Sequence, residues 1–449
     1  MRPVDMMEIL QAREERVHRQ MELLAEYKSP LVCFTMNIAG PIKNSEEIAW
    51  GFQYGSRLLL RQLDRIRARV LYRQTAYADT GNEAYVVVDY DPDELKACMV
   101  ELEDHLELGR LFDLDVLVPG GRKLERTRER GCLICGRAGK SCARSRAHSV
   151  EELQSKTRDI LIGARQQWKR ESVGELACRA LLYEACTTPK PGLVDCRNNG
   201  SHDDMDLFSF LSSAAALQPY FSHCVDIGEK TRSCSPEETF AALRWPGKQA
   251  ELRMLEATDG VNTHKGAIFT MGVVCGAVGR LEMNVWENPS RIMRECAAMT
   301  AGLTERELNN LSQGRTAGES LFLKYQTTGI RGQLEAGLPA VCMYGLPALE
   351  QGLSGGKTLE QAGISALLTM LAHMDDTNLL KRGDMDALLW SKEQAERLLK
   401  LDTVCLVDLE ALDDAFIERK LSPGGAADLL AVCYFFHFLQ MEKEFYPEI

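Results

Sequence analysis

The chain has 449 residues, 45% of them hydrophobic and 26% charged, a composition that excludes disordered and fibrous proteins. Its formal net charge of −12 argues against a nucleic-acid-binding protein. No apolar run reaches the roughly 20 residues that cross a bilayer, and the N-terminus lacks a signal-peptide pattern. We therefore expect a cytoplasmic protein with reduced cysteines and no membrane partner. At about 150 residues per domain, the length predicts two or three domains.

The first third of the chain alternates short apolar runs with helical stretches. Strands are predicted at residues 31–38, 84–89 and 110–118. Helix starts at Ser45, at Asp91-Pro92 and at Ser149 predict helices over about 45–70, 91–108 and 149–168. This alternation is typical of an α+β or an α/β domain. We predict the α+β class for residues 1–170, with a mixed sheet and helices.

Two features of this domain point to phosphate chemistry. Asp113 and Asp115 are two residues apart on a predicted strand, so both carboxylates project to the same side. Two like charges so close are costly unless a cation lies between them, and Mg²⁺ bound to a substrate's phosphates is the natural occupant. Upstream, Gly40-Pro41-Ile42-Lys43 places a turn and a lysine just before a helix start. The alternative for the acidic pair is an ordinary surface strand.

The segment 122–148 has two features of its own. Cys132, Cys135, Cys142 and His148 could form a tetrahedral zinc site, and unliganded reduced cysteines are the alternative. Residues 122–146 also hold nine basic side chains against two acidic ones. That excess predicts a docking surface for an anionic partner, or else a solvated surface stretch.

From about residue 171 the pattern becomes almost wholly helical. Helices are predicted over residues 173–187, 207–224, 236–258, 265–281, 358–372 and 425–441. The sequence therefore predicts a second domain, residues 171–449, that is an all-α helical bundle.

Most chemically reactive residues of this second domain lie in its loops. Four loops hold them, at residues 189–205, 261–266, 375–383 and 421–428. Each could be explained by caps and turns alone, since Asp, Asn, Ser and Gly favour helix ends. The four together favour a nucleotide and metal site.

Both halves resemble known families. Residues 1–170 resemble citrate lyase holo-acyl-carrier-protein synthase, the phosphoribosyl-dephospho-CoA transferase, through residues 40–43, 108–116, 132–135 and 142–144. Residues from 171 onward resemble the triphosphoribosyl-dephospho-CoA synthase family through residues 189–195, 200–202, 260–266, 328–332, 335–337, 376–378 and 421–429. Because the two families belong to one pathway, the resemblance implies a bifunctional fusion.

The resemblance of the second half implies a substrate pair and a set of site residues. ATP and 3′-dephospho-CoA would react so that the 2′-hydroxyl attacks C1 of ATP's ribose and adenine leaves. Catalysis is implied for Asp195, Asp204, Asp376, Asp428 and His264, with Asp203 at Mg²⁺. Phosphate and substrate binding is implied for Lys190, His202, Asn262, Lys265, Arg331, Asn378 and Arg382. The chain departs from this family at Asp384, where a second Gly after Gly383 is common.

The resemblance of the first half implies a nucleotidyltransferase-like domain that uses this product. A serine of the apo acyl carrier (γ) subunit would attack the α-phosphorus, and pyrophosphate would leave. Asp113 and Asp115 would hold Mg²⁺, with Lys43 and Arg110 on the triphosphate, and the basic segment would dock the carrier.

An alternative reading is that only one half is active and the other is a scaffold that binds the carrier protein. The transferase family usually has His-Pro before Leu-Gly-Arg-Leu, where this chain has His105 followed by Leu106 and Glu107.

Overall fold

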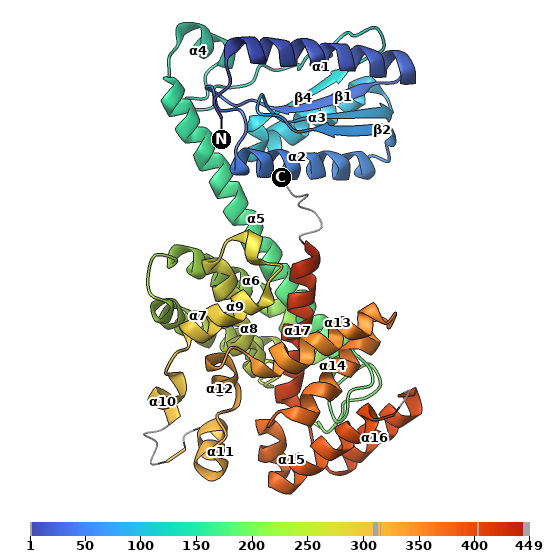
Figure 1. Cartoon of the computed structure of the whole chain (residues 1–449), viewed down its shortest axis with the longest axis vertical. Coiled ribbons are helices and arrows are strands. Elements are labelled where there is room, and N and C mark those ends of the chain that lie inside the picture. Colours follow the sequence, from blue (N-terminus) through green and yellow to red (C-terminus); the bar gives the residue numbers. More distant parts are fainter. Residues whose placement is uncertain (1, 309–312, 315, 402–403, 443–449) are drawn as a thin grey trace. The chain divides into compact units, whose positions relative to one another are not determined.

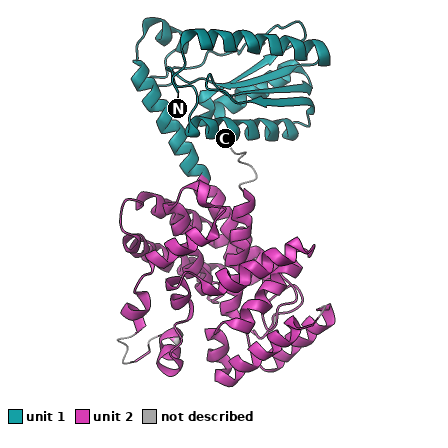
Figure 2. Ribbon diagram, viewed as in Figure 1, with its two compact units in different colours: residues 1–168 teal, residues 169–449 magenta. Residues whose placement is uncertain are grey.

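The computed structural model describes residues 2–308, 313–314, 316–401 and 404–442. It divides into two compact units, residues 1–168 and 169–449 (Figure 2). The helix α5 (Val150–Cys186) begins in the first unit and ends in the second. The sequence predicts two helices here, one ending near Trp168 and one starting at Val173. The structure has one helix of 37 residues, because nothing in the intervening segment Trp-Lys-Arg-Glu-Ser-Val breaks a helix.

Unit 1 is an α+β unit built on one four-stranded sheet with the order β2-β3-β1-β4. Its elements are α1 (Met6–Tyr27), β1 (Leu31–Met36), α2 (Glu46–Arg65), β2 (Arg69–Ala76), β3 (Glu83–Asp89), α3 (Pro92–His105), η1 (Leu108–Leu111), β4 (Phe112–Leu117) and α4 (Gly139–Ser145). Every neighbouring pair of strands is antiparallel, so the predicted mixed sheet is wrong.

The strand β2, which the sequence analysis missed, explains this difference. The helix predicted to run to Val70 ends at Arg65, and Arg67, with a positive φ of 55°, turns the chain into β2. β2 has three apolar residues in succession, Val70, Leu71 and Tyr72, and an exposed, mostly polar second half, so it lacks the apolar alternation that identifies a strand. β2 pairs with β3, which lies between β1 and β2. β1 and β2 run in the same direction but are not neighbours, so no parallel pair forms.

The two faces of the sheet differ in character. α1 lies over one face, and α2 and α3 lie over the other (Figure 1). On the α2 side, Phe34 stacks on Phe52 and meets Phe112 edge to face. Cys33 faces α1, in a cluster with Leu23 and Leu24, and is the register partner of Asp115. Asp113 and Asp115 therefore lie on the α1 side, as their predicted alternation requires.

Every regular element that the structure describes in unit 2 after α5 is a helix. These are α6 (Leu207–Lys230), α7 (Pro236–Ala257), α8 (Lys265–Arg280), η2 (Met283–Val285), α9 (Pro289–Met299), α10 (Leu303–Leu308), α11 (Ala317–Tyr325), α12 (Gly329–Glu335), η3 (Val341–Gly345), α13 (Leu346–Ser354), α14 (Leu359–His373), α15 (Thr377–Leu399), α16 (Leu406–Glu418) and α17 (Gly424–Glu442). Among the described residues, no helix has the length and apolar content to cross a membrane.

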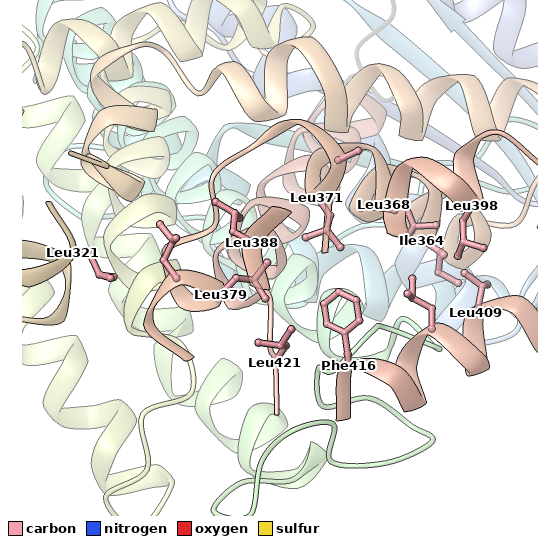
Figure 3. Packing of buried hydrophobic residues seen from close by; sticks show 14 residues of the cluster. Leu321, Ile364, Leu368, Leu371, Leu379, Leu388, Leu398, Leu409, Phe416 and Leu421 are labelled. Atoms are coloured by element: carbon pink, nitrogen blue, oxygen red, sulfur yellow. The ribbon is translucent and has the colours of Figure 1, made fainter. Parts of the chain in front are cut away.

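The helix α17 is central to the packing of unit 2. It contacts α8, α13, α14 and α15 (Figure 1). A neighbouring core joins α14, α15 and α16, and Figure 3 shows Phe416 and Leu421 facing Leu379 and Leu388 there. Leu421 precedes the loop that begins α17, so this core helps hold the polar segment 421–428 in place.

Asp384 interrupts α15 with a backbone conformation that glycine favours. Its φ of 85° and ψ of −168° lie outside the helical range, in a region that costs a non-glycine residue about 1–3 kcal/mol. This is the position where the resembling family commonly has Gly. The Asp384 carboxylate partly compensates, because it accepts hydrogen bonds from the backbone N–H groups of Asp386 and Ala387.

We expect Asp384→Gly to stabilise unit 2 by about 1 kcal/mol, because removing the strain outweighs the few tenths lost with the cap. The free energy of unfolding in urea measures this. Asp386→Gly, two residues away in regular helix, is the control and should destabilise by about 0.3 kcal/mol. Equal destabilisation by both changes would show that the Asp384 backbone is not strained.

Candidate active sites

A buried cluster of charged side chains lies where several segments of unit 2 meet. Three carboxylates, those of Glu184, Asp376 and Asp428, interact electrostatically, with Lys190 close by. The Lys190 Nζ lies 2.5 Å from Glu184 Oε1 and 2.6 Å from the Glu184 carbonyl oxygen. We call these four residues and His264 the carboxylate cluster. The positive charge of Lys190 offsets the negative charge of Glu184. The two remaining carboxylates, Asp376 and Asp428, therefore leave the cluster with a net negative charge unless they bind protons.

Asp428 has the most unusual position in the carboxylate cluster. Its Oδ2 lies 1.9 Å from where a Cβ on Gly266 would be, so only glycine allows this approach. At that point the carboxylate accepts a hydrogen bond from the Ala267 N–H, in the first turn of α8. Burial, and then the nearby Glu184 and Asp376, raise the pKa of Asp428 well above its usual value. Asp428 is therefore better suited than an ordinary carboxyl group to hold a proton.

Asp376 is occupied by backbone donors. Its Oδ1 accepts from the N–H groups of Asn378 and Leu379, at 2.7 and 3.3 Å, and its Oδ2 accepts from Ala426 at 2.8 Å. Asp376 thus ties the start of α15 to the start of α17. Burial raises the pKa of Asp376, while these backbone donors oppose that change.

Asp195 is occupied in the same way within its own loop. It accepts hydrogen bonds from the backbone N–H groups of Lys190, Arg197 and Asn198, at 2.8, 2.7 and 3.2 Å. Its side chain is buried, at 3% exposure. The geometry favours a role in shaping the loop that presents Lys190.

His264 is an uncharged imidazole at the end of α8. Its Nδ1 lies 2.7 Å from the Ser213 hydroxyl, and its ring meets Phe210 edge to face. Burial, and then the Lys190 charge, lower the pKa of His264 to about 3. Its Nε2 is buried and has no hydrogen-bond partner among the described residues. The ring can therefore give or accept one more hydrogen bond, but it cannot supply a positive charge to a phosphate.

A second group of predicted residues lies nearer the surface. His202 Nε2 lies 2.9 Å from the Ser422 hydroxyl, and Arg382 lies 3.1 Å from His202 Nδ1 and donates to the Ser201 carbonyl. Asp203 and Asp204 are exposed beside them. Asn378 lies against Gly424, where a Cβ would meet its amide nitrogen at 2.7 Å.

Three further predicted residues lie outside the carboxylate cluster. Arg331 lines a cavity of about 170 Å³ with Arg244, Lys248 and Glu251, and its guanidinium bonds to Glu307 at 2.8 Å. Lys265 pairs with Glu251 at 2.7 Å, and the Lys265 N–H donates to the Asn262 side chain. Lys265 therefore joins the loop 261–266 to this cavity.

The sequence analysis missed two buried acids that the structure assigns to the site. Glu184 lies within a helix and has no motif around it. Asp413 is fully buried and holds the loop 190–198 by accepting from Gly192 N–H and the Asn198 amide. Its spacing from Leu409 and Phe416 put it on the apolar face of α16, and that spacing could have identified it.

In unit 1, the two aspartates of β4 lie together as predicted. Asp115 pairs with Lys123 at 2.5 Å. Burial, and then the charge of Asp113, raise the pKa of Asp115. Two half-buried carboxylates on the same side of one strand are a donor set that suits a hard divalent cation.

The predicted phosphate-binding cations of unit 1 lie on loops near the ends of β1 and β4. Lys43 Nζ lies 2.5 Å from the Ile38 carbonyl, and burial followed by the Arg13 charge lowers its pKa. Arg110, in η1, donates to the Cys132 carbonyl at 2.8 Å. The ligand atoms of Cys132, Cys135, Cys142 and His148 lie within 4.8 Å of one another.

The comparisons agree with this two-unit arrangement. Residues 170–445 match the family described as ATP:dephospho-CoA triphosphoribosyl transferase, and residues 4–163 match apo-citrate lyase phosphoribosyl-dephospho-CoA transferase. Protein CitXG of Haemophilus influenzae is 37% identical over 95% of both chains, and Protein CitXG of Leuconostoc mesenteroides subsp. cremoris is 33% identical over 96% of both. The 2-(5''-triphosphoribosyl)-3'-dephosphocoenzyme-A synthase of Pectobacterium atrosepticum is 39% identical over 64% of this chain and 95% of its own length.

Proposed function

The chain belongs to the CitXG family of bifunctional transferases, and on this premise we propose how its two units make and attach the citrate lyase prosthetic group. Unit 2 joins ATP to 3′-dephospho-CoA and releases adenine. Unit 1 transfers the product to a serine of the apo acyl carrier subunit and releases pyrophosphate.

The position of Asp428 supports the assignment of the first reaction to the carboxylate cluster. Adenine leaves with the electron pair of the glycosidic bond and needs a proton, while the attacking 2′-hydroxyl loses one as the new C–O bond forms. A carboxyl of raised pKa can give the first proton and take up the second. Asp428 is our catalytic residue for both transfers.

The other members of the carboxylate cluster position the reactants. Asp376 has its oxygens on backbone donors and Lys190 is paired with Glu184, so these residues hold the site's shape, as does Asp195 in the loop beside the cluster. The His264 Nε2 offers a buried hydrogen bond to the substrate. These roles differ from the acid, base and phosphate-binding roles that the resemblance implied for them.

The phosphates of the two substrates would lie outside the carboxylate cluster. His202, Asn378 and Arg382 lie near the start of α17, where the exposed Asp203 and Asp204 would provide oxygen ligands for Mg²⁺. When bound there, Mg²⁺ offsets the charge of the triphosphate. The cavity lined by Arg331 and Lys248, to which Lys265 is linked through Glu251, would bind further phosphate groups.

In unit 1, we assign nucleotidyltransferase-type chemistry to Asp113 and Asp115. These carboxylates would hold Mg²⁺, which stabilises charge on the attacking and leaving oxygens when it is bound. Lys43 and Arg110 would bind the triphosphate group.

The exposed part of the basic segment suits an acidic carrier protein. Lys123, Arg126 and Arg130 pair with acids of unit 1 itself. The other six basic side chains are exposed and remain for docking: Arg122, Arg128, Arg137, Lys140, Arg144 and Arg146.

A two-stage assay of the whole chain tests this proposal. The protein is incubated with ATP, Mg²⁺ and 3′-dephospho-CoA, and adenine is measured before the apo carrier is added. We expect adenine first, and then pyrophosphate with a mass increase on the carrier's serine. Adenine without carrier modification, or modification only when the triphosphoribosyl product is supplied, would instead favour one active half and one scaffold.

Gly266→Ala should slow the release of adenine in unit 2, because it moves the Asp428 side chain. The added methyl group would displace the Asp428 carboxylate from α8, so we expect adenine release to fall about 10- to 100-fold. Carrier modification from supplied intermediate should be unchanged. Gly163→Ala, whose Cβ would meet no atom within 4 Å, is the control. Equal effects of the two changes on adenine release would contradict the role of this close approach.

A further inference from the structure

We propose that Cys132, Cys135, Cys142 and His148 bind one structural zinc ion. Their three sulfurs and one imidazole nitrogen lie within 4.8 Å of one another. A tetrahedral zinc with bonds of about 2.0–2.3 Å requires ligand atoms about 3.5–3.8 Å apart, so only a small contraction of the group is needed.

The local backbone presents the first two cysteines as a metal-binding turn. The N–H groups of Ile134 and Cys135 donate to the Cys132 sulfur. Gly136, with a φ of 73°, donates its N–H to the Cys132 carbonyl at 3.0 Å, and Gly131 bridges to Ala138. The chain thereby reverses direction and brings α4, with Cys142, back to the pair.

His148 supplies the fourth ligand atom of the proposed zinc site. His148 Nε2 is buried and has no hydrogen-bond partner among the described residues, which is costly for an imidazole nitrogen unless it binds something. The Cys135 and Cys142 sulfurs are 3.3 Å apart, too far for a disulfide bond and near the spacing of two zinc ligands.

The segment around this group has little else to hold it. Between residues 118 and 149, only Leu124, Cys132 and Cys142 are buried. So small an apolar core cannot order about 30 residues, and a zinc ion would supply the missing stability. Four protein ligands leave no open position, so the ion would be structural and would take no part in catalysis.

This zinc site would also position residues of the proposed transferase site. The Cys132 carbonyl accepts the hydrogen bond of Arg110, and Arg130 bonds to the Phe112 carbonyl and to Glu103. Loss of zinc should therefore impair carrier modification and leave adenine release unchanged. This consequence rests on the proposed function, whereas zinc binding itself does not.

Metal analysis of the full chain, expressed with zinc in the medium, tests the site. We expect one zinc per chain, less than a tenth as much in Cys142→Ser and His148→Ala, and an unchanged content in the control Cys98→Ser. Zinc loss should also speed proteolytic cleavage between residues 122 and 148.

If the variants do not fold, cobalt titration of the unchanged protein gives an independent result. A thiolate-to-cobalt charge-transfer band saturating at one equivalent supports the site. Less than a tenth of an equivalent of zinc with no such band would overturn the proposal, as would iron in place of zinc or a disulfide between Cys135 and Cys142.

Discussion

Asp428→Asn is expected to lower adenine release by about 1000-fold while leaving the transfer of supplied intermediate to the carrier intact. The amide has nearly the shape of the carboxyl group but cannot give or accept the proton that our mechanism requires. Adenine release, measured by chromatography under saturating ATP and 3′-dephospho-CoA, gives the rate. Asp375→Asn is the matched control and should keep full activity. Asp375 is an exposed residue of the loop before α15 and pairs with Lys392.

The stability of this variant distinguishes chemistry from misfolding. Because burial raises the pKa of Asp428 in the folded protein well above its unfolded value, its stabilising effect is fully present below the unfolded pKa and is lost as the pH rises through the folded pKa. At neutral pH the Asn variant should therefore be at least as stable as the parent chain. A variant that melts earlier, or one that retains adenine release, would refute the assignment of Asp428.

Asp113→Asn is expected to lower carrier modification by at least about 100-fold without changing adenine release. The substitution removes one of the two carboxylates that we assign to Mg²⁺. Mass spectrometry of the carrier's serine, with the triphosphoribosyl product supplied, measures the transfer step directly. Asp104→Asn, an exposed acid that pairs with Arg126 in the same unit, is the control.

The substitution of Asp113 should also change the pKa of Asp115. The charge of Asp113 is one cause of the raised pKa of Asp115, so its removal should lower that pKa and should not destabilise unit 1. Unchanged carrier labelling by a folded Asp113→Asn protein would exclude this pair as the metal site. Asp428→Asn tests the reaction assigned to unit 2, and Asp113→Asn tests the reaction assigned to unit 1.

The starts of α2, α3 and α5 were predictable because they depend on a few adjacent residues. Ser45 and Asp91 cap their helices, and Ser149 with Glu152 forms the predicted capping box of α5. The side-chain alternation of Asp113 and Asp115 was equally local. The family resemblance also came from short motifs, and the comparisons show both families in the predicted order.

Sheet topology was not predictable from the same reading. The apolar residues of β2, Val70, Leu71 and Tyr72, are consecutive and do not alternate with polar ones, so the strand pattern is weak. The order of the strands depends on the pairing of β2 with β3. The mixed sheet was wrong for this reason. Pairing between strands is a long-range property, and one missed strand changes which strands become neighbours.

What the sequence by itself determined was which residue types stand at the loops and helix ends of this protein, and which families it resembles. Only the tertiary structure decided which of those residues are available for chemistry. Asp195 and Asp376 bond to backbone N–H groups and Lys190 pairs with Glu184, whereas Asp428 lies in the space left by Gly266. The physical reason is that a carboxylate's pKa and hydrogen bonds depend on burial and on partners far away in the chain, which local spacing does not reveal.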